Sequence, residues 1–96
     1  MSHVEPPWTF LSNHSHVLIC LQREPYALMR EIAAQVGITE RAVQRIVADL
    51  ERSGFLTRNK EGRRNRYSLD LSAHLRHPIE AHRTVGEMLA LLAPVG

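Results

Sequence analysis

The stretch REIAAQVGITERAVQRIVADLERSGFL, residues 30–56, contains the strongest structural signal in this chain. Its apolar residues recur at the spacing of an α-helix, and the rhythm breaks once, at Gly37. Glycine adopts the left-handed conformation at no steric cost, so Gly37 predicts the end of one helix and a sharp reversal of the chain. Thr39 then predicts the N-cap of a second helix that ends near Ser53, before Gly54. The stretch therefore predicts two helices joined by a tight turn.

The second of these helices, residues 39–53, has one apolar face and one polar face. Its apolar residues form one side, and a stripe of arginine and glutamine forms the other. A helix-turn-helix places such a face in the major groove, where Arg and Gln make bidentate contacts with guanine and adenine. We predict contacts with bases for Thr39, Arg41, Gln44 and Arg45, and a contact with phosphate for Arg52.

After this helix the apolar residues recur with a period of two, which predicts a β-hairpin. Residues 55–58 and 66–69 read as strands, with Glu61 and Gly62 at the turn. The segment 58–66 is strongly basic, and beside a recognition helix such a hairpin reaches the DNA backbone or the minor groove. The predicted DNA contacts of the hairpin are Lys60, Arg63, Arg64 and Arg66.

Charge is distributed unevenly along the 96 residues. The net charge of the whole chain is only +2. Residues 39–66 nevertheless hold eight basic and four acidic residues, which gives +4, and the remainder is −2. A basic segment of this kind indicates a surface that faces a polyanion.

Helices are also expected on both sides of the central stretch. One begins at Ser12 or Asn13 and stops before Pro25, and the next covers residues 29–36 after a short extended piece. A last helix is predicted from Pro78, which suits a first helical position, through residue 93. The resulting division is an extended arm at 1–11, a DNA-binding domain at 12–71, and a connector with a C-terminal helix at 72–96.

The order of these features resembles one protein family. Residues 26–70, with REIAAQVGI, TERAVQRIVADLERSGFL and a basic hairpin, look like the winged helix-turn-helix domain of MarR-like and ArsR-like bacterial transcription regulators. The resemblance implies an α+β, mainly α fold, in which a three-helix core carries a β-hairpin wing and a C-terminal helix makes a dimer. It implies a cytoplasmic, homodimeric protein that binds double-stranded DNA sequence-specifically. MarR-like proteins are usually longer, with terminal helices that frame a ligand pocket.

The last helix carries more apolar surface than a single small core can cover, and large apolar residues also lie beside the Pro-Pro arm. We therefore expect a second chain to cover part of this surface, and packing within one chain is the alternative. The predicted dimerisation residues are Trp8, Phe10, Ile79, Val85, Met88, Leu89 and Leu92.

Other functions find less support in the sequence. No phosphate-binding glycine loop, nucleophile motif or paired carboxylate is evident, so we expect no enzyme and no cofactor. We interpret His74, His77 and His82 as surface or structural residues rather than metal ligands, and Cys20 as a buried apolar residue rather than a redox sensor. The N-terminal residues lack the features of a signal peptide, and no apolar run is long enough to cross a membrane.

Two alternatives share the expected fold. One is a winged helix that contacts another protein, and such a module usually has a neutral or acidic third helix. The other is an architectural DNA binder without sequence preference, which competition with unrelated DNA would separate from a regulator.

Overall fold

The computed structural model describes residues 6–93. Residues 1–5, which begin the predicted arm, and residues 94–96, which end the predicted C-terminal segment, lie outside the described residues. Within 6–93 no helix has both the length and the apolar character that a membrane crossing requires. The elements in chain order are α1 (Asn13–Arg23), α2 (Met29–Val36), α3 (Glu40–Arg52), β1 (Leu56–Glu61), β2 (Arg64–Leu69) and α4 (Val85–Leu91).

The first three helices begin and end where their local signals predict. The Ser12 side chain caps α1 by accepting a hydrogen bond from the backbone N–H of Ser15 at 3.3 Å. Thr39 caps α3 in the same way, with the N–H of Ala42 at 3.0 Å. Gly37 ends α2 with φ 85°, which is the left-handed conformation that glycine favours. The predicted helix-turn-helix is confirmed.

The hairpin is longer than its sequence pattern indicates. β1 and β2 pair antiparallel from Leu56–Leu69 to Glu61–Arg64, so the turn consists of Gly62 and Arg63 rather than Glu61 and Gly62. Gly62 has φ 63°, which fits a two-residue hairpin turn with glycine in first position. Apolar alternation marks only the base of the hairpin because the outer half has no core beneath it, and the sequence pattern therefore missed that half.

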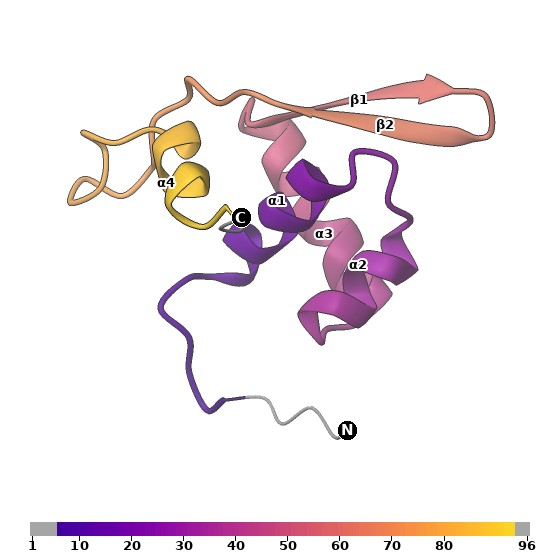
Figure 1. Ribbon diagram of the computed structural model, residues 1–96, viewed down its shortest axis with the longest axis horizontal. Coiled ribbons are helices and arrows are strands. Elements are labelled where there is room, and N and C mark those ends of the chain that lie inside the picture. The colour runs from indigo at the N-terminus through magenta and orange to yellow at the C-terminus, as the bar shows by residue number, and fades with distance from the viewer. Residues whose placement is uncertain (1–5, 94–96) are drawn as a thin grey trace.

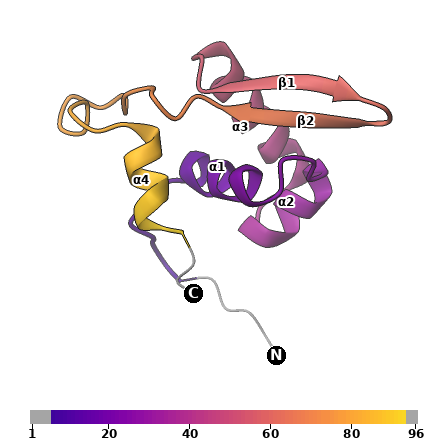
Figure 2. The same ribbon diagram turned by 45° about the horizontal axis from the view of Figure 1, so that its top comes forward.

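The helices and the hairpin meet in one core. Figures 1 and 2 show the hairpin lying across the helices and extending past α2, while α4 lies on the other side of α1. Buried apolar side chains come from every helix and from the base of the hairpin. The fully buried ones are Val17, Leu21, Ile32, Val43, Val47, Val85 and Leu89.

The prediction of a helix from Pro78 is wrong. Residues 73–75 and 83–85 run antiparallel, with hydrogen bonds from Leu75 N to Arg83 O and from Val85 N to Ala73 O at 2.9 and 2.8 Å. These bonds close residues 76–82 into a turn. α4 starts at Val85 because Thr84 and Glu87 form a reciprocal capping box there.

The structure also corrects the expected positions of two dimerisation residues. Val85 and Leu89 are each 1% exposed and pack in the core of their own chain, so neither presents a surface to a second chain. Met88 is half-buried against the same core. Trp8, Phe10, Ile79, Leu91 and Leu92 are the exposed apolar residues of these two terminal regions.

Candidate nucleic-acid interface

α3 has a buried face and an exposed face, as its sequence predicts. Val43 and Val47 are buried, and they anchor the helix to the core. Arg41, Gln44 and Arg45 are exposed. None of these three side chains makes a hydrogen bond or ion pair with another described residue. Their polar groups are therefore available to an external partner.

The two ends of the predicted stripe differ from its middle. Thr39 is exposed, but its hydroxyl already caps the helix through the N–H of Ala42. Arg52, at the other end, donates from Nη2 to Asp49 Oδ1 at 2.6 Å. Its side chain is still 74% exposed, so it can meet solvent or phosphate while paired.

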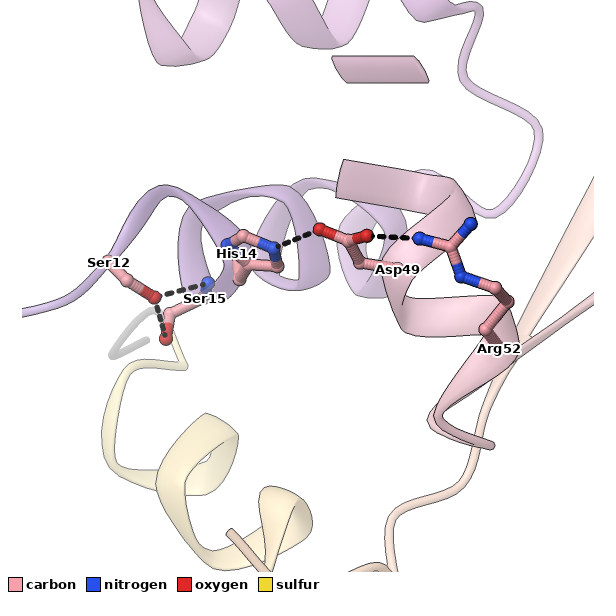
Figure 3. Close-up of polar contacts among 5 residues, drawn as sticks. All are labelled: Ser12, His14, Ser15, Asp49 and Arg52. Atoms are coloured by element: carbon pink, nitrogen blue, oxygen red, sulfur yellow. Dashed lines mark hydrogen bonds and ion pairs between the residues drawn. The ribbon is translucent and has the colours of Figure 1, made fainter. Parts of the chain in front are cut away.

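Asp49 joins α3 to the first helix. Figure 3 shows its carboxylate between the His14 ring and the Arg52 guanidinium, with His14 Nε2 3.0 Å from Asp49 Oδ2. The hydrogen bond from His14, followed by the contact with Arg52, lowers the pKa of Asp49 below its ordinary value. This acid therefore neutralises part of the positive charge at the end of α3.

The base of the wing is tied to α3 by another acid. Arg58 on β1 donates from Nη2 and Nε to the two carboxylate oxygens of Glu51 on α3, at 2.9 and 3.2 Å. A bidentate pair of this kind fixes the orientation of both side chains. Sequence analysis missed this contact because neither residue stands in a recognisable motif.

The predicted wing residues fall into two groups. Lys60 and Arg63 are exposed, and their side chains have no hydrogen-bond partner among the described residues. Arg64 donates to the backbone oxygen of Tyr26 at 3.1 Å, and Arg66 donates to Ser68 Oγ at 3.2 Å. Each of these two keeps its charge but has one donor occupied.

A groove separates α3 from the hairpin. Its volume is about 350 Å³, and it brings Gln44 on the recognition helix together with Arg63 and Arg64 on the wing. Arg52 is not among the residues that line this groove, and its guanidinium contacts Asp49 instead. The groove residues are Ala27, Leu28, Met29, Gln44, Val47, Ala48, Glu51, Arg58, Arg63, Arg64, Asn65 and Tyr67.

Sequence comparison finds a family model that matches part of the chain. Residues 12–57 match the family model described as winged helix-turn-helix DNA-binding. No curated protein sequence matches the chain at a significant level.

Solved structures share the fold. PcaV, a transcriptional regulator of Streptomyces coelicolor solved with its natural ligand, is 26% identical over 90% of this chain and 63% of its own, with a TM-score of 0.57. ZitR of Lactococcus lactis, solved in complex with DNA, is 19% identical over 73% of this chain and 49% of its own, with a TM-score of 0.54. Another structure of ZitR, described as a zinc-responsive MarR family member, is 22% identical with a TM-score of 0.51, over 73% of this chain and 50% of its own. The chain thus spans about half to two thirds of the length of these proteins.

Proposed function

We propose, from the membership of residues 12–57 in the winged helix-turn-helix DNA-binding family, that this chain is a transcriptional regulator that binds double-stranded DNA. The proposed activity is binding rather than catalysis, and its site is the cytoplasm, where the chromosome of a bacterial cell lies. α3 enters the major groove, and the wing lies against the backbone or the minor groove.

The exposed face of α3 is the observation that carries this proposal. Arg41, Gln44 and Arg45 project from a helix whose other face is fixed in the core, and no described residue occupies their donors. Arginine matches the two acceptors of guanine, and glutamine matches the donor and acceptor of adenine. A winged helix that contacts protein would not need three such side chains free on one face.

The wing supplies contacts that do not depend on sequence. Lys60 and Arg63 are exposed and free to meet phosphate, and Arg63 also lines the groove between the wing and α3. Counterion release would then add affinity for any duplex. Specificity in this arrangement comes from α3, and the wing adds affinity.

We also propose that the regulator is a homodimer. Exposed apolar side chains gather in the terminal regions, where Leu91 is 88% and Ile79 78% exposed. Trp8 and Phe10 form an edge-to-face pair with ring centroids 5.0 Å apart, and both remain open to solvent. A two-fold dimer places two recognition helices in successive major grooves, about 34–36 Å apart.

Selection of bound sequences from a random DNA pool tests the proposal directly. We expect a palindromic motif with half-sites about one helical turn apart, because a two-fold dimer reads the same bases twice. A motif without symmetry would support DNA binding and contradict the dimer. Recovery of unrelated sequences would favour an architectural binder, and a failure to retain any duplex at low salt would contradict DNA binding.

A further inference from the structure

The hairpin extends beyond the helices that support it. Its base is packed into the core through Phe55, Leu56 and Tyr67, whereas the residues around the tip are exposed (Figures 1 and 2). A two-stranded hairpin by itself is only marginally stable. Contacts that reach its outer half therefore determine where the tip arginines lie.

The loop between α1 and α2 supplies one contact near the base of the hairpin and two that reach its outer half. Tyr67 N donates to Pro25 O at 2.9 Å, Arg64 Nη1 donates to Tyr26 O at 3.1 Å, and the Tyr26 hydroxyl donates to Glu61 Oε1 at 2.9 Å. Glu61 and Arg64 form the last cross-strand pair before the turn. One loop residue, Tyr26, thus holds both members of the pair that adjoins the tip.

We infer that Tyr26 is a positioning residue for the wing, and that its hydroxyl and its backbone oxygen fix the tip where Arg63 meets the DNA backbone. The inference rests on the DNA binding proposed above. A tip that is already ordered loses less conformational freedom when it binds, so the anchor raises affinity without touching DNA. The hydrogen bond to Glu61 raises the pKa of Tyr26 above its ordinary value, because the protonated hydroxyl is the form that donates to the carboxylate.

The hydrogen bonds of Tyr26 with Glu61 and Arg64, which together anchor the tip, also explain why a basic wing contains an acidic residue. Glu61 is exposed, and at the tip its charge repels a polyanion. Its carboxylate is at the same time the acceptor for Tyr26. Two substitutions separate these effects, because Glu61→Gln keeps an acceptor oxygen and removes the charge, whereas Glu61→Ala removes both.

The experiment measures the affinity of the full chain for a duplex retained in the random-pool selection. We expect Glu61→Gln to bind more tightly than the native chain, and Glu61→Ala to bind roughly two- to tenfold more weakly than Glu61→Gln, which is the net value of one hydrogen bond. In a Tyr26→Phe background the two Glu61 variants should bind equally. Equal affinity of the two variants in the native background would overturn the inference.

A measurement without DNA separates this inference from the proposed function. Amide ¹⁵N relaxation at Gly62 and Arg63 should show greater motion in Tyr26→Phe and Glu61→Ala than in the native chain or Glu61→Gln. Unchanged tip motion with reduced affinity of Tyr26→Phe would mean that the hydroxyl contacts DNA itself, which contradicts a positioning role. Arg63→Ala is the control, because it removes the proposed DNA contact and leaves the anchor intact. If no protein in the series binds DNA, the proposed function fails, and the relaxation data still decide whether Tyr26 holds the tip.

Discussion

The hydrogen-bond partners of the arginines on α3 indicate which arginine reads a base and which contacts phosphate. Arg45 is exposed and free of partners among the described residues, whereas Arg52 is paired with Asp49 at 2.6 Å. A guanidinium that makes no internal bond can give both of its parallel donors to one guanine. Arg52 lies near the C-terminal end of the helix, which sits farther from the bases in this motif.

Replacing Arg45 with Ala should therefore weaken binding to the selected site by about 1–3 kcal/mol and relax the preference at one base position. Affinities for the selected duplex and for a random duplex would be measured at the same salt concentration. Arg76→Ala, which removes an equal charge from the connector, is the matched control. If Arg45→Ala loses the same affinity on both duplexes, Arg45 contacts phosphate and does not read a base.

Asp49 predicts a dependence of stability on pH. Its lowered pKa means that the folded state favours the charged carboxylate more than the unfolded state does. Asp49 thus contributes stability above its ordinary value of 3.8, and this contribution is lost as pH falls through the lower pKa of the folded state.

Urea unfolding of the native chain and of Asp49→Asn measures this contribution. The native chain should be the more stable at pH 7, and the difference should shrink as the pH is lowered below 3.8. Glu80→Gln removes one charge from the exposed turn at 76–82 and is the control. A difference that is constant across this range would show that the hydrogen bonds of Asp49 do not depend on its charge.

At the scale of elements, local signals predicted α1, α2 and α3 to within a residue. Ser12, Gly37 and Thr39 act on their immediate neighbours, so their meaning does not depend on the rest of the fold. The last helix was predicted from Pro78, but the pairing of 73–75 with 83–85 holds residues 76–82 in a turn, and α4 starts after its N-cap Thr84. The polar stripe on α3 was also predicted from the sequence, because it depends only on helical spacing. The hydrogen bond between Tyr26 and Glu61 was not predicted, because it joins residues far apart in sequence and no local pattern encodes it.

The position of α4 predicts unequal effects of two neighbouring leucines. Leu89 is 1% exposed and Leu91 is 88% exposed. Leu89→Ala should lower the free energy of unfolding by about 2–5 kcal/mol, because it leaves a cavity in the core, whereas Leu91→Ala should change it by roughly 0.5 kcal/mol or less. Denaturant unfolding of both variants, at a protein concentration low enough to keep the chain monomeric, gives the comparison. Similar small losses would show that α4 is not part of the cooperative core.

The whole molecule carries its two proposed interfaces on different elements. The basic side chains proposed to contact DNA belong to α3 and the wing, and the exposed apolar side chains proposed for the dimer belong to α4, the turn before it and the N-terminal arm. A hollow of about 640 Å³ on α4 is lined by apolar residues and is bordered by the ion pair between Arg83 and Glu87 at 2.8 Å. Separate surfaces allow one copy to hold a second copy and DNA at the same time.

Leu91→Asp tests the proposed dimer without disturbing the core, because the side chain is almost fully exposed in a single chain. In a dimer it would place an unpaired charge in an apolar contact, which is costly, and the equilibrium should shift to a folded monomer. Light scattering reports the mass, and circular dichroism confirms that the helices persist.

The variant should also bind a palindromic site more weakly than the native chain does. Both proteins should bind a single half-site equally, because the variant loses only the coupling of two half-sites. A native chain that is monomeric at tens of micromolar and still binds the palindromic site tightly would show that one copy suffices.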